Sequence, residues 1–86
     1  MWQVYILKCT DKTFYTGITT DVKRRVKEHN NSVLGAKYTR GRRPARLVYA
    51  SRKKNKSLAA KAEWLIKKMN RLEKIKLIKM KKLQLL

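Results

Sequence analysis

The sequence feature that most constrains the fold is an N-terminal run, Trp2–Cys9, that is apolar on both sides of an extended chain. Successive side chains of a strand point to opposite faces, so Val4 and Ile6 share one face while Tyr5 and Leu7 share the other. The β-branched and aromatic residues of this run also favour strands. The pattern therefore predicts a strand in the centre of a sheet.

Two further β-rich runs can pair with this strand. Phe14–Thr19 follows the turn signal Thr10–Thr13, so the first two runs are expected to form a hairpin. The third run is Ala45–Ala50, and a charged connector over residues 52–56 follows it. The segment that leads to Pro44 is rich in glycine and arginine, and we expect it to be an exposed loop.

Helical periodicity predicts three helices. The first has Thr20 as its N-cap and Asp21 in its first turn, where the helix dipole favours a negative charge, and it ends at residues 30–32. Ser57 is the expected cap of the second helix, and a bend near Asn70 separates the second from the third. Their apolar stripes are Val22 and Val26; then Leu58, Ala62, Leu65, Ile66 and Met69; and then Leu72, Ile75, Leu77 and Ile78.

The order of these elements is β-β-α-β-α-α. It predicts an α+β fold in which helices flank a small three-stranded, mainly antiparallel sheet. A chain of 86 residues has room for one domain, so we expect a single domain over residues 1–86. Residues 79–86 are expected to form a frayed basic tail.

Composition narrows the possible functions. The chain has 24 Lys and Arg against 5 Asp and Glu, a formal net charge of +19, so the expected partner is a nucleic acid. Cys9 has no cysteine partner, which excludes a disulfide framework and fits a reducing cytoplasm; Cys9 and His29 cannot complete a zinc site. Because no apolar run approaches ~20 residues and no leader is evident, we expect a cytoplasmic monomer without membrane contact.

Arg25 and His29 are candidates for phosphate binding. They lie four residues apart, so on a helix their side chains emerge from one face about one turn apart. Together they can grip a phosphate group. The simpler alternatives are that Arg25 is one more solvated cation and that His29 complements the negative end of the helix dipole.

Glu63 is a candidate metal ligand. Its neighbours at i−4, i+3 and i+7 are Ala59, Ile66 and Asn70, which place it at the rim of the apolar stripe. A carboxylate at such a rim can bind a hard cation through oxygen. The commoner explanation is an ion pair with Lys67, one helical turn later.

Tyr5 and Tyr15 fall on the two hairpin strands, where a phenol ordinarily fills the core or a sheet edge. Gly17 follows Tyr15 by two residues within the second strand. A glycine there indicates that a bulge, a helix or a ligand approaches the backbone closely.

The series Val4-Tyr5, Tyr15-Thr16-Gly17, Asp21-x-x-x-Arg25-x-x-x-His29 and Glu63 resembles the GIY-YIG endonuclease superfamily. The likeness extends from Trp2 to about Ile78, and the stretch from Tyr38 to Tyr49 is similar to the small stand-alone bacterial branch of that superfamily. Two positions depart from the family motifs. Gln3 stands in place of the first glycine and Thr16 in place of the second isoleucine, while both tyrosines and Gly17 are kept. We match the family's later asparagine to Asn70.

The resemblance implies a metal-dependent endonuclease that hydrolyses nucleic-acid phosphodiester bonds. One Mg²⁺ or Mn²⁺ would be held by Glu63, because the chain is too poor in acids for a two-metal centre. Tyr5 would be the general base, directly or through His29, and its pKa would be lowered by Arg25. Arg25 would stabilise charge on the non-bridging oxygens, and Tyr15 would bind a phosphate oxygen or the attacking water.

Binding is expected to come from basic clusters that contact phosphates without reading sequence. They are Arg40, Arg42, Arg43 and Arg46 on one side of the third strand, and Arg52, Lys53, Lys54 and Lys56 on the other. DNA is the favoured substrate, although the sequence distinguishes neither DNA from RNA nor duplex from single or branched strands.

Two other classes of protein share parts of this pattern. A non-catalytic ribosome- or nucleoid-associated binder fits the composition, but it has no need for the joint presence of the tyrosines, Arg25, His29 and Glu63. A membrane-surface anchor built on the lysine-rich C-terminal helix ranks last, because that helix lacks interfacial Trp or Phe after Trp64.

Overall fold

The computed structural model describes residues 1–31 and 34–84. The strands and helices are β1 (Trp2–Lys8), β2 (Phe14–Thr19), α1 (Val22–Asn31), α2 (Lys37–Arg40), β3 (Arg46–Lys53), α3 (Lys56–Lys68) and α4 (Arg71–Gln84). Apart from the four-residue helix α2, this is the predicted order of elements.

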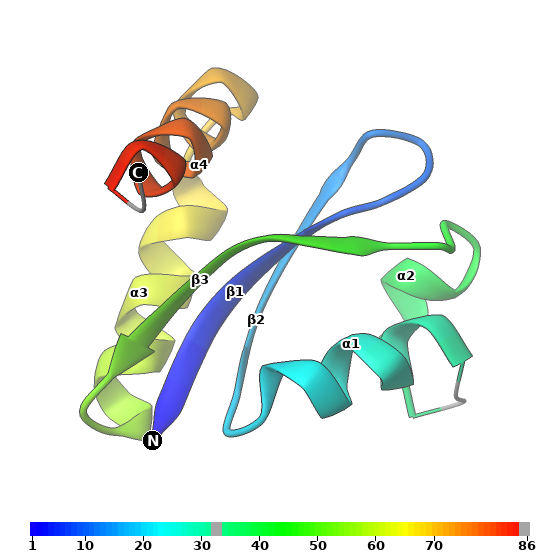
Figure 1. Ribbon diagram of the computed structural model, residues 1–86, viewed down its shortest axis with the longest axis horizontal. Coiled ribbons are helices and arrows are strands. Elements are labelled where there is room, and N and C mark those ends of the chain that lie inside the picture. Colours follow the sequence, from blue (N-terminus) through cyan, green and yellow to red (C-terminus); the bar gives the residue numbers. More distant parts are fainter. Residues whose placement is uncertain (32–33, 85–86) are drawn as a thin grey trace.

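The sheet is antiparallel with strand order β2-β1-β3, so the strand with two apolar faces is the central one, as predicted. In the hairpin Tyr5 lies opposite Gly17 and Leu7 lies opposite Tyr15. A register shift on the β3 side, between Ile6 and Leu7, marks a bulge. Helices α1 and α2 lie on one side of the sheet and α3 and α4 on the other (Figure 1). The α+β expectation is therefore confirmed.

Each face of β1 contributes to a separate core. Val4 and Ile6 are fully buried and pack with Ile66 of α3 and Ile78 of α4. The second core, on the α1 side, contains the buried residues Tyr5, Leu7, Cys9 and Ala45, with Tyr15, Val22, Val26 and Ala50 packed against it. Because of the strand alternation, Tyr5 faces α1 from the middle of the sheet.

The helix caps differ from the predicted ones. The α1 cap is Asp21 instead of Thr20, since Asp21 Oδ1 accepts a hydrogen bond from the Arg24 amide at 3.1 Å. Asn55, and not Ser57, caps α3 and accepts from the Leu58 amide at 2.9 Å. In each case a side-chain oxygen accepts from a free amide of the first turn, as a cap requires.

Three other expectations need correction. The exposed loop before Pro44 contains α2, whose Thr39 is fully buried. β3 extends through Lys53, three residues further than expected, because Trp2 and Gln3 of β1 offer pairing partners to it. On α3 the buried positions are Ala59 and Ile66, whereas Leu58 and Leu65 are exposed.

The C-terminal region is more regular than the expected tail. Helix α4 continues through Gln84, so residues 79–84 are helical, and residues 85–86 lie outside the described part of the chain. Ser32, expected at the end of the first helix, also lies outside it; α1 is described as far as Asn31. No helix within the described ranges has the length and apolar character needed to cross a membrane.

Candidate active site

The site is centred on a hydrogen bond between Tyr5 of β1 and His29 of α1. Tyr5 Oη lies 2.8 Å from His29 Nε2, and both side chains are buried. The ring of Tyr15, from β2, lies edge-on to His29, with ring centroids 5.0 Å apart, and its centroid is 6.4 Å from that of Tyr5. The hairpin and the helix thus bring three predicted site residues into one aromatic cluster.

Gly17 is required for the position of the Tyr5 phenol. A Cβ atom at Gly17 would lie 2.6 Å from Tyr5 Oη and 2.8 Å from its Cζ, which is closer than van der Waals contact allows. Gly17 is the cross-strand partner of Tyr5 on the same face. The close approach that the sequence indicated at Gly17 is therefore that of the Tyr5 ring itself.

Arg25 borders this cluster. Its Nη1 donates to Glu28 Oε1 at 2.8 Å and to the Leu34 carbonyl at 2.7 Å, and its side chain is 24% exposed. The guanidinium is also near enough to Tyr5 to influence its ionisation through a hydrogen bond and through its charge. Arg25 is thus held at the boundary between the buried phenol and solvent.

His29 does not take the exposed position that a phosphate grip with Arg25 requires. Its side chain is fully buried, with Tyr5 on Nε2 and Thr39 on Nδ1. A phosphate could reach Arg25 but not this imidazole. The hydrogen bond instead pairs His29 with Tyr5. This pairing fits the alternative in which Tyr5 acts as the general base through His29.

Glu63 approaches from α3. Its negative charge is the weakest of the influences on the pKa of Tyr5, which it acts to raise. Glu63 Oε2 also forms an ion pair with Lys67 Nζ at 3.3 Å, the commoner explanation that the sequence analysis gave for this residue. An exposed pair of this kind contributes only a few tenths of a kcal/mol, so it leaves the carboxylate available to another cation.

The remaining acidic residues have structural partners. Asp21 caps α1, Asp11 pairs with Arg42, Glu28 pairs with Arg25, and Glu73 accepts from the Asn70 amide at the start of α4. Within the described ranges no three His, Cys, Asp or Glu side chains cluster around a common point. A cation at this site would thus rely on Glu63 as its carboxylate ligand and on water or phosphate oxygens for the rest, a donor set that Mg²⁺ accepts.

Burial sets the ionisation of the central pair. Desolvation, with a smaller contribution from Tyr15, raises the pKa of Tyr5 to about 12, although Arg25 acts in the opposite direction. Desolvation and then the charge of Arg25 lower the pKa of His29 to about 4. Both groups are therefore neutral at pH 7. Arg25 does act to lower the pKa of Tyr5, as expected, but burial outweighs it, so the net pKa is raised and not lowered.

Thr39, which the sequence analysis did not single out, completes the site. Its hydroxyl lies 2.9 Å from His29 Nδ1. The approach of α2 to α1 that makes this contact needs Gly35, where a Cβ atom would lie 2.6 Å from the Glu28 carbonyl oxygen. Tyr38 of the same helix stacks on Tyr15 with centroids 5.9 Å apart. A glycine followed by a short polar segment carries no periodic signal that would have identified these residues.

Arg42 and Arg43, expected to contact phosphates, have structural contacts. Arg42 Nε pairs with Asp11 Oδ2 at 2.9 Å, its Nη1 donates to the Tyr38 carbonyl, and its guanidinium lies 4.1 Å from the centroid of the Tyr38 ring. Arg43 Nε donates to the His29 carbonyl. These two arginines connect the basic loop to the β1–β2 turn and to the C-terminal end of α1.

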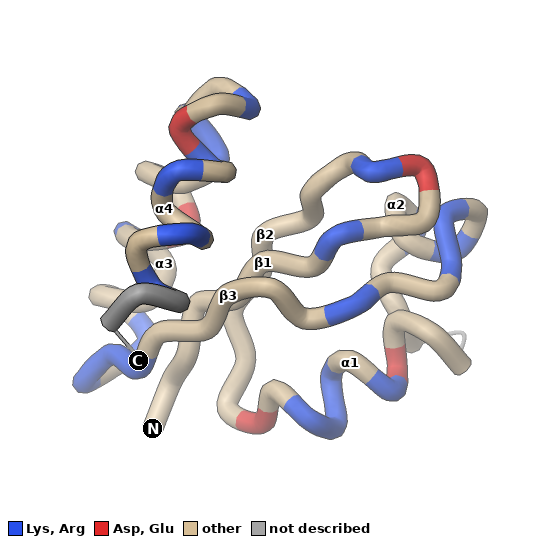
Figure 2. The backbone as a smooth tube through the Cα atoms, turned by 45° about the horizontal axis from the view of Figure 1, so that its top comes forward, with Lys and Arg blue, Asp and Glu red and all other residues tan. Residues whose placement is uncertain are grey.

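The other predicted binding residues lie at opposite ends of β3. Arg46 is at its start, six residues after exposed Arg40 at the end of α2, while Arg52 and Lys53 are at its end, followed by Lys54. Figure 2 shows Lys and Arg at these ends and also along α1, α3 and α4. The basic residues are therefore distributed over several elements around the sheet.

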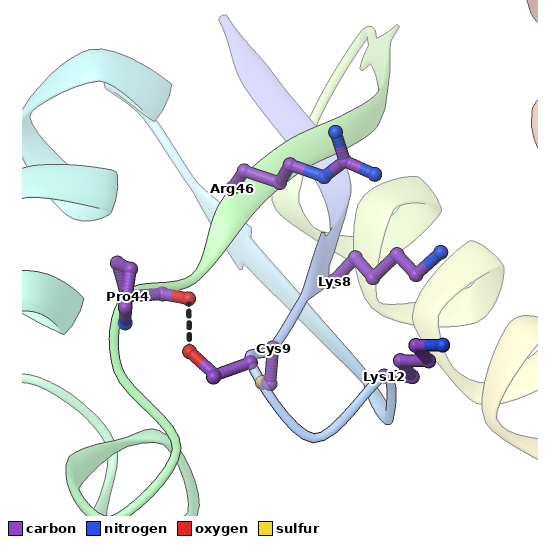
Figure 3. A pocket seen from close by; sticks show the side chains of 6 residues that line it. Lys8, Cys9, Lys12, Pro44 and Arg46 are labelled. Carbon is purple, nitrogen blue, oxygen red and sulfur yellow. Dashed lines mark hydrogen bonds between the residues drawn. The ribbon is translucent and has the colours of Figure 1, made fainter.

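A pocket of about 350 Å³ lies at the turn of the β1–β2 hairpin and is lined in part by basic residues. Lys8, Lys12 and Arg46 extend along one side of it (Figure 3). On the other side the Thr10 hydroxyl donates to the Pro44 carbonyl at 2.9 Å. Lys8 and Lys12 are thus additional basic residues that the sequence analysis did not select.

Asn70 has a clear structural role. Its Oδ1 accepts from the Glu73 amide at 2.9 Å, and its own amide donates to Glu73 Oε1 at 2.9 Å. This reciprocal pair is a capping box at the N-terminus of α4. The functional match of Asn70 stays a prediction.

Comparison with known proteins supports the resemblance. The family model of the GIY-YIG catalytic domain matches residues 1–76, a range that contains every predicted catalytic residue. A UPF0213 protein of Desulfotalea psychrophila is 50% identical over 78 residues, which are 91% of this chain and 71% of that protein. A UPF0213 protein of Clostridium perfringens is 49% identical over 81 residues, 94% of this chain and 86% of that protein.

A solved structure shows the same likeness. The solution NMR structure of a UPF0213 protein from Bacillus halodurans is 48% identical in sequence and superposes with a TM-score of 0.61. The match covers 94% of this chain and 86% of that chain. The described fold therefore agrees with an experimentally determined relative.

Proposed function

This chain belongs to the GIY-YIG catalytic domain family, and from that membership we propose that it is an endonuclease that hydrolyses phosphodiester bonds, with DNA as the favoured substrate and one divalent cation as cofactor. The family indicates a nuclease-type function and a nucleic-acid partner. The observation that supports the finer proposal is the set of groups around the Tyr5 phenol. His29 of α1 is hydrogen-bonded to it, Tyr15 of β2 packs beside it, and the charges of Arg25 and, most weakly, Glu63 of α3 act on its pKa.

Tyr5 is the proposed general base. In the resting site its proton is on the phenol, because its pKa is about 12. The proton passes to His29 Nε2, 2.8 Å away, and the resulting phenolate accepts a proton from the attacking water. The water oxygen forms a bond to phosphorus as the bond to the bridging oxygen breaks. The leaving oxygen takes a proton from solvent and His29 gives up to solvent the proton it received, which returns Tyr5 and His29 to their neutral resting forms.

Arg25 stabilises both charges that this reaction creates. Its guanidinium favours the Tyr5 phenolate, since it already lowers the pKa of that group. It is partly exposed, so a phosphate can approach it from solvent. Its planar set of donors suits the non-bridging oxygens, whose charge increases in the transition state.

Glu63 is the proposed metal ligand. Four of the five acidic residues serve as caps or arginine partners, which leaves Glu63 with its weak Lys67 pair as the carboxylate best placed for a cation. When bound, Mg²⁺ or Mn²⁺ would supply positive charge for the departing oxygen. Tyr15 would orient the attacking water or a phosphate oxygen beside Tyr5.

The experiment is cleavage of labelled single-stranded, duplex and branched DNA and RNA, with and without Mg²⁺, by the wild type and two variants. Glu63→Gln should abolish metal-dependent cleavage and retain binding, because it removes the ligand charge at constant size. Lys67→Ala should keep cleavage, because it removes only the ion pair. Equal activity of wild type and Glu63→Gln would refute the metal site, and no metal-dependent cleavage of any substrate by the wild type would indicate a non-catalytic binder.

A further inference from the structure

The second ring nitrogen of His29 has a buried partner, Thr39. His29 Nδ1 lies 2.9 Å from Thr39 Oγ1, and both side chains are fully buried. The Thr39 hydroxyl also donates to the Ala36 carbonyl oxygen at 2.9 Å. A hydroxyl has one proton, so a Thr39 hydroxyl that donates to Ala36 must accept the hydrogen bond from His29. In this arrangement the proton of the neutral imidazole is on Nδ1.

We infer that Thr39 is a positioning residue that keeps neutral His29 in the Nδ1–H tautomer, with the lone pair of Nε2 directed at the Tyr5 hydroxyl. The catalytic consequence of this inference rests on the proposed function, whereas the tautomer itself does not. In a histidine, the hydrogen bond that one ring nitrogen makes commonly determines whether the other nitrogen carries the proton.

The opposite tautomer fits the surroundings less well. It would place a proton on Nε2, pointing at the Tyr5 oxygen. The phenol proton would then lose its acceptor, a costly loss for a buried hydroxyl. Nδ1 would then be an acceptor, so the Thr39 hydroxyl would have to donate to Nδ1 and give up its hydrogen bond to the Ala36 carbonyl oxygen. The hydrogen bond that Nδ1 would gain, from the Ala36 amide, is long at 3.4 Å.

The Nδ1–H tautomer is also the one that proton transfer needs. Nε2 can accept the Tyr5 proton only while its lone pair is free. After the O–H bond of Tyr5 breaks and an N–H bond forms at Nε2, His29 is an imidazolium that donates from both nitrogens. Its Nδ1–H bond to Thr39 persists through this change, so no buried group loses its partner.

The test reads the tautomer directly. His29 is the one histidine of the chain, so its ring nitrogens can be observed without ambiguity by ¹H–¹⁵N multiple-bond NMR of protein labelled with ¹⁵N-histidine. At neutral pH the wild type should show a protonated Nδ1 and an unprotonated Nε2. Thr39→Ser keeps the hydroxyl and should give the same spectrum. Thr39→Val keeps the size but removes the hydroxyl, and it should shift the population toward the Nε2–H form.

Either of two results would overturn the inference: an Nε2–H tautomer in the wild type, or an unchanged tautomer in Thr39→Val. Should Thr39→Val fail to fold by circular dichroism, the wild-type and Thr39→Ser spectra still decide, since the inference requires Nδ1–H in both.

Kinetics provide the second readout. Thr39→Val should lower kcat by about fivefold or more, the factor that corresponds to one net hydrogen bond, and leave KM unchanged. Thr39→Ser should restore kcat. A Thr39→Val enzyme with wild-type kcat would contradict the positioning role. If the wild type cleaves no nucleic acid, the proposed function fails and the NMR result alone decides the tautomer.

Discussion

Lowering the pH from about 7 to about 5 should destabilise this protein by about 2 kcal/mol through His29 alone. His29 is fully buried, and desolvation lowers its pKa from 6.5 to about 4. Across this window the unfolded chain binds a proton at the imidazole and the folded chain does not. The stabilisation that His29 contributes is therefore complete above its pKa in the unfolded chain, 6.5, and is lost as the pH falls toward its pKa in the folded protein, about 4.

The magnitude follows from the two pKa values. The difference between 6.5 and about 4 corresponds to about 3 kcal/mol when the loss is complete. About two-thirds of it is lost by pH 5. Carboxyl groups titrate mainly at lower pH, and the pKa of Asp11 is lowered further by its hydrogen bond from Thr13, so the window above pH 5 isolates His29.

The assay is urea unfolding at both pH values for the wild type and for His29→Gln, an uncharged side chain that cannot titrate. The wild type should lose about 2 kcal/mol and the variant much less. A direct NMR titration of the single histidine provides a check that does not depend on the variant. Equal losses in both proteins, or a histidine that titrates near 6.5 in the folded state, would refute the buried neutral imidazole.

Three further predictions concern stability and titration. Because the pKa of Tyr5 is raised to about 12, the fold should lose about 3 kcal/mol between about pH 10 and about pH 12, and Tyr5→Phe should remove the tyrosinate transition near pH 12 seen by ultraviolet absorbance. Arg42→Ala should cost roughly 1–2 kcal/mol in urea unfolding through its lost contacts with Tyr38, whereas Arg52→Ala, at an exposed position, should change stability by less than about 0.5 kcal/mol. Asn70→Ala should cost about 1 kcal/mol by uncapping α4, and Asn70→Asp, which keeps an acceptor, should retain most of that stability.

The sheet could be predicted from the sequence because its signal is local. The alternation in Trp2–Cys9 has two apolar sets, which only a central strand with cover on both faces can bury. The spacing of Arg25 and His29 likewise fixed them to one face of a helix. These inferences needed no knowledge of distant residues.

The parts that could not be predicted depend on tertiary contacts. The partner of His29 Nδ1 is set by α2, a four-residue helix positioned by the tight passage at Gly35. The direction of the Tyr5 pKa change depends on how far burial outweighs the charge of Arg25. The structural use of Arg42 depends on Asp11, which is 31 residues away in sequence. Residue type and spacing do not determine such balances.

The central claim is that the group of residues around Tyr5 cleaves nucleic acid, and single-turnover cleavage with Mg²⁺ tests it most directly. The proteins are the wild type, Tyr5→Phe and the matched control Tyr49→Phe, whose tyrosine packs in the core on the opposite face of the sheet. With folding verified by circular dichroism, Tyr5→Phe should be slower by about 10²-fold or more, the scale of a lost general base, and Tyr49→Phe should retain activity. Wild-type rates in Tyr5→Phe, or equal losses in the two variants, would contradict the account.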